Sequence, residues 1–579
     1  MHQNHSIWRF SMPYMPEANR DQFMMCSLES MIDPESDVRL IDAFVESLDF
    51  ESLDIKSETA KEGRPRYNDR ALAKLLIYGY ENDIRSSRKL QKACKINLEV
   101  RWLMKGLEPD FRTISDFRKN NITSMKKIFR EFNKRLSEVI HWGFTAIDGS
   151  KFQASNSKDN NFTKSKLDDR IKWLDGHVEE YLRLLAEADS EDEQEPGSLT
   201  REELEEKLQK ARERHARYEG YQKLMEETGQ AQLSLVDADA KLMKNKNGFA
   251  VAYHPQTAVD SETHIIRDYQ MTNQVTDHNL IDSTMTEIKK ESGNQVIDAV
   301  ADKGYVCEED MVRCLEQGIR PHVITDDGQN SYDIEIPYSE ETGDFESTKA
   351  DDLKKCLHNG VIPNAYADVI TDMEVKEVRR LVKDEEGKAE ADHLYGTEDE
   401  MLARAKEGYF VRDPERNLVY CPVGEILRQK CVKKNGNIRY ANKNACRHCK
   451  FRNKCYKGKN EWKEIDFSKD TLEKPCTGWL KAEGKAPDKK GVRKGYHHYK
   501  KIRVVRFKLK PDREKTSKRL CLSEHPFGTI KRAMGSGFFL LRRMWKVDGE
   551  FALLCLGYNL KRSKNLLGYA KMKELMALA

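Results

Sequence analysis

The chain has 579 residues, of which 34% are charged, and its mean hydropathy is -0.78. No apolar stretch reaches the length of a transmembrane helix or of a signal peptide's central segment, so the composition excludes an integral membrane protein and favours a cytoplasmic one. Lys and Arg number 100 against 97 Asp and Glu, a net charge of +3, so a nucleic-acid surface would have to arise from segregation of charge. The length allows two to four domains.

Residues 1–141 are expected to form a helical domain. Apolar residues recur at helical spacing over 38–48 and 122–139, and Thr113 with Asp116 is predicted to cap the second helix. Between them, residues 68–106 resemble a helix-turn-helix in outline, which would offer Arg85, Arg88 and Lys89 to DNA phosphates. A helical bundle with a solvated basic face explains the same pattern equally well.

From residue 142 to 330 the pattern changes to strands. One short apolar run ends at Asp148 and a second ends at Asp302, so two carboxylates are predicted at strand ends. Residues 249–272 are expected to form two strands joined at Asp260-Ser261. An insertion at 163–228 has coiled-coil spacing, with an acidic segment and Pro196-Gly197 before a second helix capped by Thr200 and Glu203, which predicts an antiparallel helical hairpin.

A third carboxylate, Glu524, opens a helical segment in which Lys531 and Arg532 follow on the same side. Carboxylates from two strands and a helix can hold two hard divalent cations, Mg²⁺ or Mn²⁺, for in-line attack on a phosphodiester. An Asp at a strand end is usually a turn or cap residue, so the set of three carries the prediction. The chain has no Walker motif, which argues against ATP dependence.

Other acidic and histidine side chains of the strand region are weaker candidates for metal ligands. A role as turn residues is the simpler interpretation for the four aspartates, and the two histidines are weaker still. These residues are Asp237, Asp239, Asp260, Asp277, His254 and His278.

Residues 331–511 form a polar insertion that carries cysteines. The chain has 13 cysteines and no secretory signal, which indicates reduced thiols. A Cys-x2-Cys pair with one further cysteine on each side predicts a structural zinc site, and unligated thiols are the alternative. The predicted ligands are Cys421, Cys446, Cys449 and Cys455, with Cys431 or His448 as a possible replacement for one of them.

Residues 489–513 mix aromatic side chains with a dense run of cations. Such a segment can follow a phosphate backbone and stack on bases, although a solvated face has the same composition. The cations expected to contact DNA are Arg493, Lys494, Lys500, Lys501, Arg503 and Arg506. Residues 512–579 then return to helix with Glu524 near the start.

The order strand with Asp, strands, strand with Asp, insertion, helix with Glu resembles the ribonuclease H-like fold of DDE transposases. Many short segments of the chain are similar to those of bacterial insertion-sequence transposases with an N-terminal helical domain and a cysteine-bearing insertion. They include GRPRYNDRALAKLLIYGY, PDFRTISDFRKNN, AIDGSKFQAS, YHPQTAVD, ADKGY, EHPFGTIKR and GYNLKR.

This resemblance implies an α/β catalytic core with Asp148, Asp302 and Glu524 as the metal-binding triad and Lys531 as a phosphate-contacting lysine. It implies cleavage at the inverted ends of an element, transfer of the 3′ ends into target DNA, and a homodimer in the synaptic complex. In a related group, Tyr-x2-Arg-x3-Glu precedes this lysine; here Leu520 holds the Arg position and Ser517 the Tyr position, while Arg519 is one residue early. Arg519 and Arg532 are further expected DNA contacts. The alternatives are a nuclease without strand transfer and a catalytically silent, domesticated DNA-binding protein.

Overall fold

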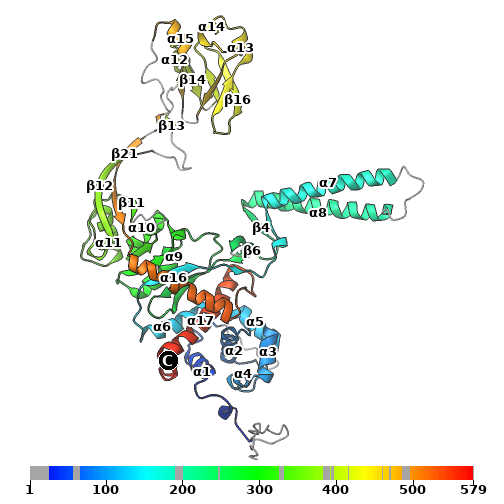
Figure 1. The fold of residues 1–579 in the computed structure, drawn as a ribbon, viewed down its shortest axis with the longest axis vertical. Coiled ribbons are helices and arrows are strands. Elements are labelled where there is room, and N and C mark those ends of the chain that lie inside the picture. Colours follow the sequence, from blue (N-terminus) through cyan, green and yellow to red (C-terminus); the bar gives the residue numbers. More distant parts are fainter. Residues whose placement is uncertain are drawn as a thin grey trace, which may run out of the picture. The chain divides into compact units, whose positions relative to one another are not determined.

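The computed structural model describes residues 25–55, 66–188, 200–245, 248–324, 331–381, 391–392, 397–414, 416–458, 461–468, 471–485, 496–497 and 499–577 (Figure 1). The chain divides into two compact units, each described by itself. The first comprises Met1–Ile334, Glu340–Met373 and Phe507–Ala579, and the second comprises Glu335–Ser339 and Glu374–Arg506. No helix within the described ranges combines the length and apolar character needed to cross a bilayer.

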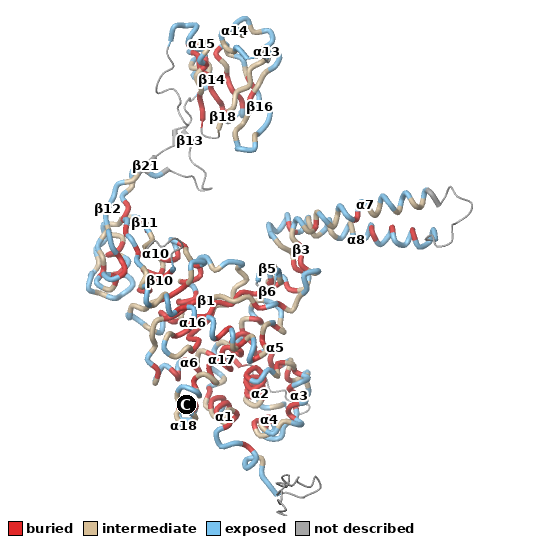
Figure 2. Tube along the Cα trace, viewed as in Figure 1, coloured by how far each residue is buried: buried red, intermediate tan, exposed pale blue. Residues whose placement is uncertain are grey.

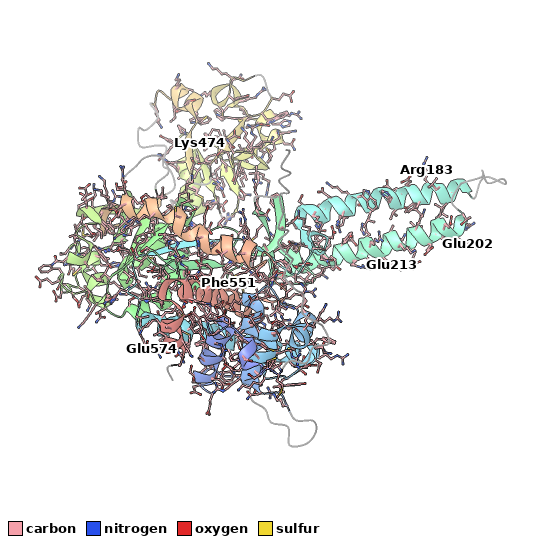
Figure 3. The ribbon with its side chains drawn as sticks, turned by 60° about the horizontal axis from the view of Figure 1, so that its bottom comes forward. Arg183, Glu202, Glu213, Lys474, Phe551 and Glu574 are labelled. Atoms are coloured by element: carbon pink, nitrogen blue, oxygen red, sulfur yellow. The ribbon has the colours of Figure 1, made fainter. Side chains whose placement is uncertain are left out.

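Helices from both ends of the chain share one apolar core in the first unit. They are α1 (Asp37–Ser47), α2 (Asp69–Glu81), α3 (Ser87–Ile96), α4 (Leu98–Leu103), α5 (Phe111–Asn121), α6 (Ser124–Ser137), α17 (Met544–Leu567) and α18 (Tyr569–Met576), preceded by the exposed 3-10 turn η1 (Glu29–Met31). Helix α17 packs against α2 and α6 and is buried over most of its length, as its apolar sequence on all sides requires (Figure 2). Phe551, labelled in Figure 3, lies on this helix.

The predicted cap of the helical run after residue 110 is wrong. Asp110, and not Thr113, begins α5, because the extended Asp110 accepts the backbone N–H groups of Arg112 at 2.8 Å and Thr113 at 3.1 Å. The run is also two helices, α5 and α6, separated at Ile122 and Thr123. Apolar spacing alone did not reveal this break, since both helices bury the same kind of face.

A five-stranded mixed sheet forms the centre of the first unit, in the order β10-β9-β1-β7-β8. Its strands are β1 (Thr145–Gly149), β7 (Gln256–Asp260), β8 (Ile266–Gln270), β9 (Ile297–Ala301) and β10 (Ile319–Val323). Strands β1, β7 and β8 pair antiparallel, whereas β1, β9 and β10 pair parallel. This is the ribonuclease H-like arrangement that the resemblance predicted, and the α/β fold class is confirmed.

Helices α9 (Ile281–Ser292), α10 (Glu308–Gln317) and α16 (Arg513–Gly528) pack on this sheet. The 3-10 turn η3 (Lys303–Tyr305) follows β9, and the π-helical turn η5 (Thr529–Ala533) follows α16. Because α16 contacts β1, β7 and β9, the Glu-bearing helix lies against the strands that carry the two aspartates.

Residues 249–272 form three strands and not the two that were predicted. The additional strand, β6 (Gly248–Tyr253), belongs to a separate small sheet with β2 (Phe152–Gln153) and β5 (Lys241–Asn245). The backbone leaves it at His254 and Pro255, before β7 begins. Strands β3 (Asn161–Thr163) and β4 (Gln232–Ser234) pair antiparallel beside the 3-10 turn η2 (Lys158–Asn160) and lead into the helical insertion.

The insertion forms two helices, α7 (Lys164–Ala188) and α8 (Arg201–Thr228), that run side by side (Figures 1 and 3). Thr200 and Glu203 form the predicted capping box: Glu203 N–H donates to Thr200 Oγ1 at 3.3 Å, and Thr200 N–H donates to Glu203 Oε2 at 3.0 Å. Both predictions are therefore confirmed. The acidic segment and Pro196-Gly197 lie outside the described residues.

Further elements of residues 331–381 and 496–509 are β11 (Tyr332–Pro337), α11 (Ala350–Asn359), η4 (Asn364–Tyr366), β12 (Ile370–Leu381), β20 (Tyr496–His497) and β21 (Tyr499–Leu509). Strands β11, β21 and β12 pair with one another, and β20 pairs with β13 (Ala391–Asp392). The division between the two units falls within β11, β12 and β21.

The second unit is built on an antiparallel six-stranded sheet in the order β18-β17-β16-β15-β14-β19. Its strands are β14 (Tyr409–Asp413), β15 (Leu418–Tyr420), β16 (Ile426–Val432), β17 (Ile438–Ala441), β18 (Glu464–Phe467) and β19 (Glu473–Pro475). Its helices are α12 (Glu398–Lys406), α13 (Lys443–Arg447), α14 (Arg452–Cys455) and α15 (Thr477–Ala482). Two small apolar clusters, one around Tyr409 and one around Phe410, give the unit a core of its own.

Candidate functional site

Asp148 lies near the end of β1, the central strand of the mixed sheet. Its Oδ1 accepts the backbone N–H of Gly149 at 2.9 Å, and its Oδ2 lies 3.9 Å from Nη1 of Arg519. Burial raises the pKa of Asp148 to about 6, and the negative charge of Asp302 adds to this, while Arg519 and a hydrogen bond from Ser523 oppose it. For this carboxylate the cost of burial therefore outweighs the positive charge of Arg519.

Asp302 directly follows β9 and caps η3, where its Oδ1 accepts the N–H of Gly304 at 2.9 Å. The parallel pairing of β1 with β9 sets Ala146 opposite Val300, so Asp148 and Asp302 each follow that pair by two residues at the same edge of the sheet. Both carboxylates lie close enough to the buried Tyr305 to affect its hydroxyl group. Burial raises the pKa of Tyr305 well above the usual range, and the charges of Asp148 and Asp302 raise it further. The structure thus brings these two predicted carboxylates together.

Glu524 lies on α16 but is exposed, on the side of the helix away from its buried face. The buried face presents Arg519 and Ser523 to Asp148, one helical turn apart. The one-residue offset of Arg519 seen in the sequence therefore places this arginine inside the site, while Leu520 is 55% exposed. Among the described residues, no group of three or more His, Cys, Asp or Glu side chains is close enough to hold a metal ion.

Lys531, in η5, lies beside the end of β1. Its Nζ donates to Ser150 Oγ at 2.6 Å and to the backbone oxygen of Lys151 at 2.8 Å, and it lies 4.4 Å from the centre of the Phe152 ring. These contacts fix the ammonium group next to the segment that follows Asp148. Arg532, the next residue, is exposed.

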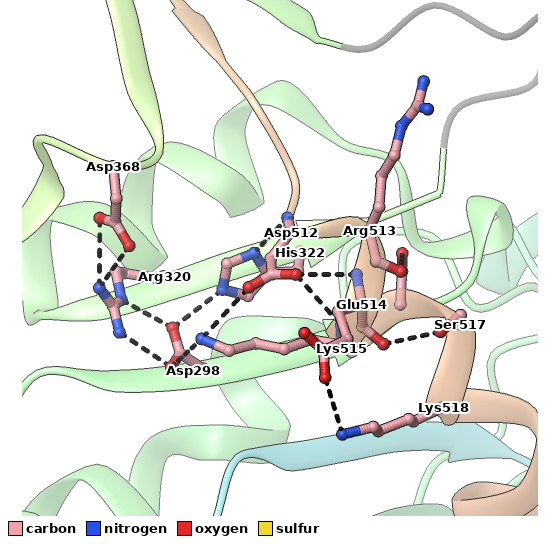
Figure 4. Close-up of polar contacts among 11 residues, drawn as sticks. Asp298, Arg320, His322, Asp368, Asp512, Arg513, Glu514, Lys515, Ser517 and Lys518 are labelled. Carbon is pink, nitrogen blue, oxygen red and sulfur yellow. Dashed lines mark hydrogen bonds and ion pairs between the residues drawn. The ribbon is translucent and has the colours of Figure 1, made fainter.

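A network of charged groups attaches the start of α16 to the sheet (Figure 4). Asp298 on β9 accepts Arg320 Nε at 2.6 Å and Lys515 Nζ at 2.7 Å, and it lies 2.9 Å from His322 Nε2. His322 Nδ1 accepts the N–H of Asp512, the N-cap of α16, at 3.0 Å, so its Nε2–H donates to Asp298. Burial raises the pKa of Asp298, but the three hydrogen bonds outweigh burial and hold that pKa well below its usual range.

Asp277 was predicted to be a turn residue, yet the structure places it beside the two aspartates. It lies in the loop between β8 and α9, and its charge also raises the pKa of Tyr305. Its Oδ1 accepts Gln256 Nε2 at 3.2 Å and lies 3.3 Å from His254 Nε2. Sequence spacing carried no signal for this position, because the loop reaches the site only through the strand order of the sheet.

The basic side chains of the N-terminal helices separate into buried and exposed ones. Arg85, predicted to contact DNA, is instead buried: it donates to the backbone oxygens of Phe538 at 2.7 Å and Gly535 at 3.2 Å. Its guanidinium group joins the helical domain to the chain after η5 and is not presented on the surface. Arg88 and Lys89 on α3 are exposed, as a DNA contact requires.

The described cations of β21 lie on its exposed side, and carboxylates of neighbouring strands pair with Lys501, Arg506 and Lys508. Lys501 lies 2.7 Å from Glu377, and Arg506 lies 2.6 Å from Glu335. Arg503 is exposed and stacks on Tyr338. The predicted contacts Arg493 and Lys494, and the side chain of Lys500, lie outside the described residues.

The four predicted zinc ligands gather in the second unit. Cys421, Cys446, Cys449 and Cys455 line one cavity of about 40 Å³ between β15, β16 and the short helices α13 and α14. Cys476, which sequence reasoning did not single out, lies with its Sγ 3.5 Å from Sγ of Cys455. Cys431 is exposed on β16 and does not line this cavity, and neither does His448.

Two family models match the chain. The model described as "Transposase domain (DUF772)" matches residues 26–120, which cover the helices from η1 to α5. The model described as "Transposase DDE domain" matches residues 420–563, which include the cysteines, Glu524 and Lys531. Asp148 and Asp302 lie outside both matched segments. Neither the curated proteins nor the solved structures gave a match. By its two transposase domains and its mixed sheet, the chain belongs to the DDE transposases of insertion sequences.

Proposed function

We propose that this transposase cuts DNA at the inverted ends of its own element and joins the freed 3′ hydroxyls to target DNA. The observation that carries the proposal is the position of Asp148 and Asp302, which leave two parallel strands side by side where α16 packs. A homodimer that pairs two element ends follows from the family, because both ends must be cut and joined together.

In this proposal Asp148, Asp302 and Glu524 hold two divalent cations. The donors are carboxylate oxygens, which suit Mg²⁺ or Mn²⁺. Such cations, when bound, activate the attacking hydroxyl and stabilise the leaving oxygen of the scissile phosphate. Glu524 is exposed on α16 in this structure, so its place in the triad rests on the sequence resemblance and would require its carboxylate to move toward Asp148.

Two basic side chains lie at the proposed site. Lys531 is fixed beside the end of β1 by Ser150 and Lys151, and it would contribute one charge to orienting the scissile group. The guanidinium group of Arg519 is buried beside Asp148 and Ser523, where it would balance part of the carboxylate charge.

The test compares cleavage and binding for Asp148→Asn, Asp302→Asn and Glu524→Gln on a duplex that carries an element end. Each substitution removes a charge while keeping the size of the side chain, so we expect cleavage in Mg²⁺ to fall by at least about 10³-fold with binding largely intact. Asp159→Asn is the matched control, because this side chain is 88% exposed. A variant that still nicks the duplex at the wild-type rate excludes that residue from the triad.

The proposed DNA surface includes Arg88 and Lys89 on α3, Arg532 after α16 and the exposed cations of β21. Arg493, Lys494 and Lys500 remain part of the proposal from sequence. A plot of the logarithm of the DNA-binding constant against the logarithm of the salt concentration has a negative slope. Each lost phosphate contact is expected to reduce the steepness of that slope by about one unit. A combined Lys501→Gln, Arg503→Gln and Arg506→Gln variant tests β21, and a wild-type slope would assign these cations to contacts within the protein alone.

We also propose a structural zinc ion in the cysteine cavity. Four thiols around one small cavity match the number and type of ligands in a closed zinc site. Because the apolar clusters in the described part of the second unit are small, a metal would contribute much of the stability of α13 and α14. About one zinc per chain is expected by elemental analysis of reduced protein, and none would refute the proposal.

A further inference from the structure

The carboxylate of Asp277 lies between the two strand ends of the proposed site. A Cβ placed on Gly304 would lie 3.0 Å from Asp302 Oδ1 and 3.5 Å from Asp277 Oδ2, so these two oxygens flank one backbone position. A Cβ placed on Gly149, the neighbour of Asp148, would lie 2.6 Å from Asp277 Oδ1. Glycine at position 149 lets the carboxylate of Asp277 approach the end of β1, since a Cβ there would collide with it.

The two oxygens of Asp277 differ in their surroundings. Oδ1 accepts Gln256 Nε2 at 3.2 Å and lies 3.3 Å from Nε2 of His254, and both of these side chains are buried. Gln256 in turn accepts a hydrogen bond from the hydroxyl of the buried Tyr305. Oδ2 accepts no hydrogen bond from the described part of the chain and lies on the side of Asp302. A buried donor such as Gln256, which holds one oxygen and leaves the other without a hydrogen bond, is typical of the support behind a metal-binding carboxylate.

A role as a turn or capping residue does not account for this arrangement. The N-cap position of α9 is Leu280, and the first backbone N–H groups of that helix donate to the carboxylate of Asp310, not to Asp277. The side chain of Asp277 accepts only from other side chains, across the sheet edge, whereas an Asx turn or a cap requires a nearby backbone N–H. The fold therefore directs this carboxylate toward the proposed catalytic site.

Arg519 contributes one positive charge beside these carboxylates. Its side chain is nine-tenths buried, its Nη1 lies 3.9 Å from Asp148 Oδ2, and the same nitrogen donates to Ser523 Oγ at 3.5 Å. One guanidinium group does not balance the carboxylates of Asp148, Asp302 and Asp277, so the site has a surplus of negative charge that divalent cations would offset.

We propose that Asp277 is a further metal-binding carboxylate of this site, beyond Asp148, Asp302 and Glu524, and that Gln256 holds it in position. The inference rests on the proposed function, because it assigns a ligand to the same divalent cations. It predicts that removing the charge of Asp277 weakens cation binding even without DNA.

Mn²⁺ binding to the full-length, DNA-free protein is the test, measured by electron paramagnetic resonance of free Mn²⁺ during a titration. We expect Asp277→Asn to weaken Mn²⁺ binding by about 10- to 100-fold, as loss of a carboxylate ligand or of its support does elsewhere. Asp159→Asn should bind as the wild type does. An Asp277→Asn protein with wild-type Mn²⁺ affinity and stoichiometry would overturn the inference.

Two further variants make the outcome decisive. If the metal-free Asp277→Asn protein melts at a lower temperature than the wild type, Asp277→Glu, which keeps the charge, is compared with it. The inference is supported if Asp277→Glu binds Mn²⁺ more tightly than Asp277→Asn. It is contradicted if the two variants bind Mn²⁺ equally. Asp148→Asn separates this inference from the proposed function. When Asp148→Asn loses Mn²⁺ and Asp277→Asn does not, only the inference fails; when neither loses it, the proposed metal site fails as well.

Discussion

Asp148→Asn is expected to stabilise the metal-free protein at neutral pH. Burial raises the pKa of Asp148 to about 6, whereas an exposed aspartate titrates near about 3.9. A carboxyl with a raised pKa binds its proton more tightly in the folded state, so folding stability falls as the pH rises from about 4 to about 6. A difference of about 2 pKa units corresponds to about 3 kcal/mol, fully present at pH 7. Asparagine carries no charge at any pH and avoids this loss.

Thermal unfolding between pH 5 and pH 8, in a chelating buffer, measures this effect. The melting temperature of the first unit in Asp148→Asn should exceed that of the wild type above about pH 7, and the two should converge toward pH 5. Asp159→Asn, an exposed aspartate of the same unit, should follow the wild type throughout. An equal or lower melting temperature for Asp148→Asn at pH 7.5 would refute the reasoning from burial.

Three further outcomes follow from particular contacts. In α17, a methyl group on Gly549 would collide with a backbone oxygen, whereas a methyl group on Gly557 would lie 3.0 Å from the nearest atom. Gly549→Ala should therefore lower the melting temperature, and Gly557→Ala should change it less. Lys515→Met should lower DNA cleavage more than DNA binding, because Lys515 anchors α16 to the sheet; equal losses would contradict this positioning role. Cys446→Ser should reduce the zinc content measured by elemental analysis, whereas Cys431→Ser, outside the cavity, should leave it unchanged.

The sequence predicted the central part of the site because strand ends carry a local signal. Asp148 and Asp302 each end an apolar run, and parallel strands must deliver such residues to the same edge of a sheet. The helical hairpin and its capping box were predicted for a similar reason, since helical spacing and the Thr200/Glu203 pair are local patterns. The zinc ligands remain a prediction, although their four thiols do line one cavity.

Other features depend on contacts between distant segments and were missed. Arg85 reads as a surface cation in its helix, but residues more than 400 positions later surround its guanidinium group. Asp277 reads as a loop residue, and only the pairing of β1 with β7 brings His254 and Gln256 to it. In the sequence, Arg519 lies one residue before the Arg position of the Tyr-x2-Arg-x3-Glu motif. In the structure, the helical register of α16 directs Arg519 toward Asp148 and leaves Leu520 exposed to solvent. These positions are decided by tertiary packing, which spacing does not encode.

Strand transfer is the activity that tests the proposed function most directly. Purified protein would be incubated in Mg²⁺ with a pre-cut element end bearing a 3′ hydroxyl and a supercoiled plasmid as target, and the joined products sequenced. We expect plasmids with the element end attached through its 3′ oxygen, none with a 3′-deoxy end, and none with Asp302→Asn, because the 3′ hydroxyl is the nucleophile and the carboxylates hold the cations. Cleaved DNA without joined products would identify a nuclease without strand transfer, and joining that survives Asp302→Asn would place the reaction at another site.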